Sequence, residues 1–203
     1  MWTASLLRRG IALLAGLAFS LAPFGGPTKD EEPPLSVGIE HTFTFRTNSD
    51  ADLADWALGQ FDRAGLDLPP LAVAFHNDRE PCGGHFGLYR TGDPALVDIC
   101  GFNWDRFVVT AKKTLLHELG HAWSQHILSD EERDRFLALR DLDTWGDDRF
   151  PWEEQGSEQA AEIIAWALMD QEIQLAKVGE ASREALTGAY LQLTGSLPLE
   201  RVP

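Results

Sequence analysis

The sequence predicts an α+β fold in which helices pack on one face of a small, mostly antiparallel sheet. Short segments of alternating apolar and polar residues are concentrated before residue 101, and a single helical segment interrupts them. After residue 104 the apolar residues recur at helical spacing in several stretches. Strands followed along the chain by helices are typical of the α+β class.

The first half of the chain carries the strand patterns and one helix. A strand is predicted over residues 39–46, where apolar side chains alternate, and a helix follows over residues 51–64 with Ser49 or Asp50 as its cap. Pro69-Pro70 ends this unit. Three further strands are predicted beyond it, the last two forming a hairpin, at residues 71–75, 86–90 and 96–100.

The second half is helical apart from one long loop. A helix is predicted over residues 107–128, and Ser129 with Glu132 forms a capping box that begins the next helix, which ends near residue 139. Residues 141–156 show no periodicity, and loops of this length usually serve a function. Two more helices are predicted, the first capped by Ser157 and ending near residue 177, the second over residues 183–193.

The N-terminal residues differ from the rest of the chain. Arg8 and Arg9 precede an apolar run at residues 11–22, a pattern that is typical of a secretory signal and is short for a membrane span. Residues 1–22 are therefore predicted to be a signal peptide, with an uncleaved membrane anchor as the alternative. Residues 23–36 are rich in proline, glycine and charge and are predicted to be a flexible linker. The folded domain is expected over residues 37–203.

The two cysteines agree with export to an oxidising compartment. Cys82 and Cys100 flank the predicted hairpin and lie too far apart in sequence for a CxxC metal clip. A disulfide between them is therefore predicted, and the protein is expected to be secreted or otherwise extracytoplasmic, or anchored to the membrane through residues 1–22.

The charge of the chain excludes one class of partner. The formal net charge is −15 at pH 7, so the protein is expected to repel nucleic acid and anionic lipid headgroups. Contact with a membrane is expected only through the possible N-terminal anchor.

A metal-site motif lies in the first long helix of the second half. His117 and His121 are four residues apart, so their rings leave one face of the helix a single turn apart and can bind one Zn²⁺. Glu118 lies between them and leans toward the same face, where a glutamate can take a proton from water and pass it to a leaving amine. Gly120 is expected to keep this helix slim where the sheet or a substrate approaches.

Catalytic zinc sites usually have three protein ligands, so a further ligand is required. Glu158 is the best candidate, at the start of a later helix, and Glu162 follows it by four residues on the same face. Glu162 is expected to hydrogen-bond the outer N–H of a ligand histidine. Glu154 is the competing ligand, but Gly156 disfavours a continuous helix from Glu154 to Glu158.

These two motifs resemble the gluzincin class of zinc metallopeptidases. HELGH followed by E-x-x-A-E-x-x-A is similar to the active-site helix and the "glutamate helix" of that class, and the size is closer to its minimal members. The resemblance implies a zincin-like fold, one zinc ion per chain, and hydrolysis of peptide or protein substrates by a zinc-bound water that Glu118 activates. It implies an oxyanion donor as well, and the candidates stay open among Tyr89, Tyr190, His41, His76, His85 and His126.

Two other hypotheses remain at this point. The chain can be a zinc-binding module without catalytic activity, or an extracellular interaction domain in which HELGH occurs by chance. Neither explains why a glutamate accompanies the two histidines, nor the acidic pair at Glu158 and Glu162.

Overall fold

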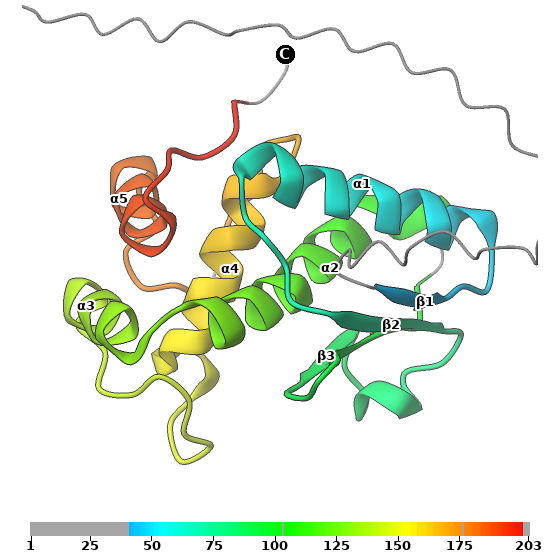
Figure 1. The fold of residues 1–203 in the computed structure, drawn as a ribbon, viewed down its shortest axis with the longest axis horizontal. Helices are drawn as coiled ribbons and strands as arrows, with labels where there is room; N and C mark the ends of the chain where they lie inside the picture. The colour runs from blue at the N-terminus through cyan, green and yellow to red at the C-terminus, as the bar shows by residue number, and fades with distance from the viewer. Residues whose placement is uncertain (1–40, 103, 176, 201–203) are drawn as a thin grey trace, which may run out of the picture. The chain divides into compact units, whose positions relative to one another are not determined.

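The computed structural model describes residues 41–200, apart from residues 103 and 176. The signal peptide or anchor predicted over residues 1–22 and the linker predicted over residues 23–36 lie outside the described residues. Within them the protein has five α-helices and a four-stranded mixed sheet, which confirms the α+β class (Figure 1). None of these helices is both long enough and apolar enough to cross a bilayer.

The sheet is mixed rather than mostly antiparallel, so that part of the prediction was wrong. Its strands, in the spatial order β1-β2-β4-β3, are β1 (Thr42–Thr44), β2 (Leu71–His76), β4 (Ala95–Cys100) and β3 (Gly87–Arg90). The pairs β1–β2 and β2–β4 are parallel, and only β3–β4 is antiparallel. The helix between β1 and β2 is the physical reason for the first parallel pair, because a helical crossover returns the chain to the end of the sheet from which it started.

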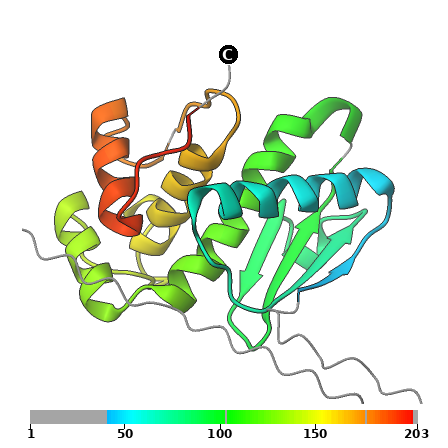
Figure 2. The same ribbon diagram turned by 45° about the horizontal axis from the view of Figure 1, so that its top comes forward.

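The helices cover one face of the sheet and extend beyond it. In chain order they are α1 (Asn48–Ala64), α2 (Trp104–Ile127), α3 (Asp130–Arg140), α4 (Gly156–Leu168) and α5 (Arg183–Thr194). Figures 1 and 2 show α1 and α2 beside the sheet and α3, α4 and α5 on the side of α2 away from it. Side chains from alternate positions of β2 and β4 form one core with these helices, including Leu71, Val73, Phe75, Val97, Ile99, Leu115, Leu116, Leu119, Ile163 and Ile164.

Two of the predicted helix starts need correction. Thr47, and not Ser49 or Asp50, is the N-cap of α1: its hydroxyl accepts the N–H of Asp50 while the Asp50 carboxylate accepts the N–H of Thr47. The helix α4 begins at Gly156 with Gln155 as its N-cap, so Ser157 does not cap it. The capping box of Ser129 and Glu132 at α3 is confirmed.

The predicted end of α4 near residue 177 was also wrong. The chain leaves the helix after Leu168, because Met169 is extended and its side chain is buried in the core rather than continuing the helical face. The break predicted between Glu154 and Glu158 is present, since Glu154 belongs to a separate short 3₁₀ helix, η2 (Trp152–Glu154).

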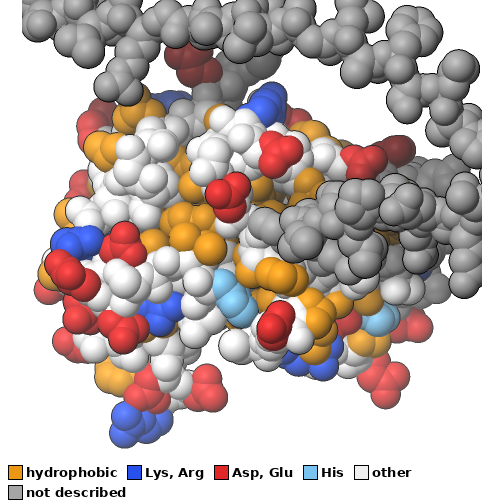
Figure 3. Space-filling view, viewed as in Figure 1, with side chains coloured by type: hydrophobic (Ala, Val, Ile, Leu, Met, Phe, Trp, Pro, Cys, Tyr) orange, Lys and Arg blue, Asp and Glu red, His pale blue; other side chains and the backbone are white. Residues whose placement is uncertain are grey.

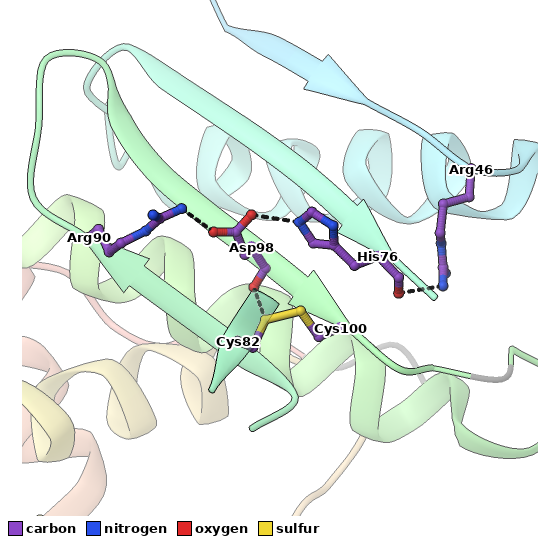
Figure 4. Close-up of a disulfide and its surroundings, with 6 residues drawn as sticks. All are labelled: Arg46, His76, Cys82, Arg90, Asp98 and Cys100. Atoms are coloured by element: carbon purple, nitrogen blue, oxygen red, sulfur yellow. Dashed lines mark hydrogen bonds and ion pairs between the residues drawn. A yellow bond between two sulfur atoms is a disulfide. The ribbon is translucent and has the colours of Figure 1, made fainter. Parts of the chain in front are cut away.

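The disulfide between Cys82 and Cys100 is present, and both cysteines are fully buried. It joins the end of the 3₁₀ helix η1 (Glu80–Cys82) to the end of β4, and a disulfide is compatible with an extracellular location. On the same outer face of the sheet, the Asp98 carboxylate contacts His76 on β2 at 2.7 Å and Arg90 on β3 (Figure 4). This side chain therefore links three neighbouring strands.

An ion pair fastens the N-terminus of α1 to the end of β2. The buried Asp50 carboxylate lies 2.8 Å from the Arg46 guanidinium, which also donates to the backbone carbonyl of His76 at 2.7 Å. Burial would raise the pKa of Asp50, but hydrogen bonds and charge from Arg46 outweigh burial and lower that pKa below its ordinary value. The charged form of Asp50 is therefore part of the folded state.

We expect Asp50→Asn to lower the free energy of unfolding at pH 7 by about 3 kcal/mol, because it removes the buried negative charge that faces the Arg46 guanidinium. The pKa of Asp50 is lower in the folded than in the unfolded protein. Its stabilisation is thus present above the unfolded pKa and is lost as the pH falls through the folded one. Urea unfolding from pH 7 to pH 3 should show this loss in the wild type and less of it in the variant.

Asp55→Asn is the matched control, since Asp55 lies on the exposed side of the same helix. Its unfolding should follow that of the wild type at every pH. Equal losses in the Asp50 and Asp55 variants would contradict a special role for the Arg46–Asp50 pair.

Candidate metal centre

The structure brings His117, His121 and Glu158 together although Glu158 lies far away in sequence. The Nε2 atoms of the two histidines are 3.0 Å apart, and the Glu158 Oε2 atom is 3.2 Å from each. A zinc ion bound tetrahedrally at about 2.0–2.1 Å separates its ligand atoms by about 3.3 Å, close to this triangle. These three residues can therefore hold a metal ion.

The chemistry of the three atoms also fits a cation. Each imidazole nitrogen can offer a lone pair, and a carboxylate oxygen is an acceptor. A single proton can bridge only one pair of the three atoms, whereas a metal ion contacts all of them at once. His117 and His121 are each 9% exposed, so both side chains are largely shielded from solvent.

The two ligand-bearing helices meet through residues without bulk. A Cβ atom added at Gly120 would lie 3.1 Å from the Ala161 Cα atom and 3.3 Å from its carbonyl oxygen. Gly120 therefore permits close packing of α2 on α4. The expectation that it makes room for the sheet or a substrate was wrong. Ala161, whose side chain is a single methyl group, leaves α4 narrow at this crossing.

The position of Glu158 depends on the long loop before α4. The N–H groups of Gly156 and Ser157 donate to the backbone carbonyls of Thr144 and Trp145, at 2.9 and 2.7 Å. These carbonyls satisfy helix-terminal donors that a side-chain cap would otherwise take. Glu158 follows in the first turn of α4, where a negative charge is favourable.

The pKa shifts agree with a site built from mutually opposed charges. Burial would raise the pKa of Glu158, but hydrogen bonds from His117 and His121 outweigh burial and hold that pKa well below its usual range. Burial would lower the pKa of His117, but Glu158, Glu118 and Glu162 together raise it. The Glu158 carboxylate is therefore held in its ionised form beside the two imidazoles.

Glu118 is buried beside the histidines and is 7% exposed. Burial raises the pKa of its carboxyl, and the charges of His117 and His121 offset only part of that shift. The backbone N–H of Tyr89 on β3 also donates to this carboxylate. Glu118 is thus held between the metal-site helix and the edge strand of the sheet.

The hydrogen bond predicted between Glu162 and the outer nitrogen of a histidine is not formed, although Glu162 lies near that nitrogen of His117. Its Oε1 atom is 3.6 Å from His117 Nδ1, and that buried nitrogen has no hydrogen-bond partner among the described residues. The other oxygen of Glu162 lies 2.8 Å from the Lys113 ammonium, one turn before His117 on α2. Lys113 was not anticipated from the sequence.

Two aromatic rings lie against the two histidines of the candidate metal centre. The Tyr89 ring stacks on His121 with centroids 5.7 Å apart, and the Trp152 ring stacks on His117 at 6.0 Å. Sequence reasoning named Tyr89 only as a possible oxyanion donor and did not single out Trp152. The only sequence signal for Trp152 was its position in the long loop between two predicted helices.

The other candidate oxyanion donors lie elsewhere or are inaccessible. Tyr190 is fully buried in the core, where burial raises its pKa to about 12, and His76 lies on the outer face of the sheet (Figure 4). The hydroxyl of Tyr89 is buried, and its ring stacks on His121. His85 and His126 are exposed, the latter in the last turn of α2.

In comparisons with known proteins, no family model, no curated protein and no solved structure matches this chain. The class of protein is therefore defined by the fold and the site alone: an α+β domain with a disulfide and a possible His–His–Glu metal site.

We expect Glu158→Ala to weaken zinc binding severely, because it removes one of the three convergent ligand atoms. The loss should exceed the roughly 10–100-fold that follows from removing a residue that only hydrogen-bonds a ligand. Competition with a chromophoric chelator would give the affinities. Glu154→Ala is the matched control, since Glu154 is exposed on η2, and it should bind zinc like the wild type. A larger loss at Glu154 than at Glu158 would show that the third ligand is wrongly assigned.

Proposed function

We propose that this chain is an exported zinc metallopeptidase of the gluzincin type, with one zinc ion held by His117, His121 and Glu158. The observation that carries the proposal is the convergence of these three ligand atoms beside the buried carboxylate of Glu118. A site that only binds a metal has no need of that carboxylate. A hydrolase needs a base there.

The donor set favours zinc among the common metals. Two imidazoles and one carboxylate are the protein ligands of one class of catalytic zinc site, which keeps a further position open for water or substrate. Calcium and magnesium prefer ligand sets made of oxygen atoms. A bound zinc ion would polarise the scissile carbonyl and lower the pKa of an attacking water.

The residues of the chain supply the remaining steps. Glu118 accepts the proton of the attacking water and delivers it to the leaving amine, and its burial, which raises its pKa, suits a group that must exchange a proton. Tyr89 and Trp152 restrict the rings of His121 and His117 to the orientation in which both Nε2 atoms face the same point.

The arrangement of the sheet is consistent with a peptide substrate and with a zincin-like fold. The strand β3 is at one edge of the sheet, runs antiparallel to β4, and contributes Tyr89 to the site. An extended peptide can add to such an edge by backbone hydrogen bonds, which would lay it alongside Glu118. Acidic side chains are spread over the visible face rather than gathered in one patch (Figure 3), which suits a role in solubility more than in substrate choice.

We expect Glu118→Gln to retain the fold and the zinc while peptide hydrolysis falls about 10²–10⁴-fold, the usual contribution of a general base. Glu118 donates none of the three ligand atoms, and an amide cannot accept the proton of water. Wild type and variant should be compared on a mixed peptide library, with zinc content measured in both.

Glu154→Gln provides the control, because it makes the same chemical change on an exposed residue near the site. It should hydrolyse peptides like the wild type. Equal hydrolysis by the Glu118 and Glu154 variants would remove Glu118 from the mechanism. A zinc-loaded wild type without activity on any peptide would instead favour a zinc-binding module, and a wild type that binds no zinc would favour an interaction domain.

A further inference from the structure

The edge strand β3 touches the carboxylate of Glu118 at a position that has no side chain. A Cβ atom added at Gly87 would lie 2.2 Å from Glu118 Oε1 and 2.7 Å from its Cδ and Cγ atoms. Such distances are far shorter than any van der Waals contact. Every residue other than glycine at this position would therefore displace the Glu118 side chain.

No backbone requirement explains glycine at this position. Gly87 does not have the positive φ angle that favours glycine in turns. It is paired with Ile99 in the regular register of β3 and β4. Gly87 is the first residue of β3, and a glycine paired within a sheet often marks a place where another group approaches closely. Here the approaching group is Glu118.

A second contact fixes the same carboxylate to the same strand. The Tyr89 N–H donates to Glu118, and the Tyr89 ring stacks on the ligand histidine His121. Gly87 and Tyr89 are two residues apart, so both lie on the face of β3 that meets α2. Gly87 is paired with Ile99 of β4, and Tyr89 is paired with Val97. The strand thus holds Glu118 in a defined place relative to His121.

We propose that Gly87 is a positioning residue for Glu118: its missing side chain forms the notch in which the carboxylate lies while the Tyr89 N–H holds it. The catalytic consequence rests on the proposed function of Glu118 as general base. The position was not recognised from the sequence, where Gly87 is one of three glycines near the start of the hairpin.

The consequence of Gly87→Ala follows from which atoms overlap. The Glu118 carboxylate is the far end of a flexible side chain, so it can move aside while the strand and the three ligand atoms stay in place. We expect zinc affinity to change less than about threefold, whereas kcat falls about 10²-fold, as it does when a reacting group is misplaced by about 1 Å. KM should change much less than kcat. A variant that raised KM and kept kcat would show that the methyl group obstructs the peptide rather than Glu118, and would overturn the proposal.

A measurement that does not depend on activity tests the contact itself. Unfolding midpoints of zinc-loaded wild type, Gly87→Ala, Glu118→Ala and the double variant form a double-mutant cycle. We expect Gly87→Ala to lower the midpoint when Glu118 is present, and to leave it unchanged or raise it when Glu118 is alanine, because the overlap is then gone. Gly188→Ala is the control, since an added Cβ there meets nothing within 4 Å, and its effect should be independent of residue 118.

The outcomes separate the proposal from the proposed function. Additive midpoints for Gly87→Ala and Glu118→Ala would overturn the positioning role, even if the enzyme is active. If the midpoints are coupled but the wild type hydrolyses no peptide, the contact between Gly87 and Glu118 is supported and the proposed peptidase activity is refuted. If Gly87→Ala alone fails to fold while the double variant folds, the coupling between residues 87 and 118 is demonstrated directly. Failure of both to fold would contradict an overlap confined to Glu118.

Discussion

The crossing of α2 and α4 at Gly120 and Ala161 is the contact on which the candidate metal centre depends. Gly120 directly precedes the candidate ligand His121, and Ala161 follows the candidate ligand Glu158 by about one helical turn. The distance between the helix axes at this point therefore sets the distance between Nε2 and the carboxylate oxygen. A larger residue at Gly120 would press on the backbone of α4, which has no flexible end to move aside. Most residues of α4 are buried, so packing around this helix fixes its position against α2.

The electrostatics of the site extend beyond the three ligand atoms. Three carboxylates, those of Glu118, Glu158 and Glu162, are close enough to act on one imidazole, that of His117. Lys113 balances part of this charge through its ion pair with Glu162. A divalent cation would balance most of the remainder, and a ligand that binds only the folded state stabilises it by mass action. Metal binding and folding stability are thus expected to be linked in this domain.

Sequence reasoning succeeded where a local pattern determined the outcome. The four-residue spacing of His117 and His121 required one helix face, and the break at Gly156 separated Glu158 from Glu154. It also placed Glu158 beside the two histidines, but it failed for backbone and packing contacts that no sequence motif marks. The N-terminus of α4 is satisfied by the carbonyls of Thr144 and Trp145, which no side-chain capping rule anticipates. The notch at Gly87 and the stacked ring of Trp152 likewise depend on tertiary contacts. The parallel pairing of β1 and β2 is different, because the helix between them was visible in the sequence and its topological meaning was overlooked.

The attachment of α4 to the loop before it limits how this part of the chain can vary. The carbonyl groups of Thr144 and Trp145, near the start of this loop, receive the N–H groups of Gly156 and Ser157, and Glu158 is only one or two residues beyond those donors. Surface loops normally tolerate insertions and deletions. An insertion within residues 146–149, ahead of Trp152 and its contact with His117, can bulge outward. An insertion between Gln155 and Glu158 would rotate the Glu158 carboxylate away from the histidines by about 100° per residue. Among relatives that retain the site, the length of this loop is thus free to drift in its middle but not at its junction with the helix.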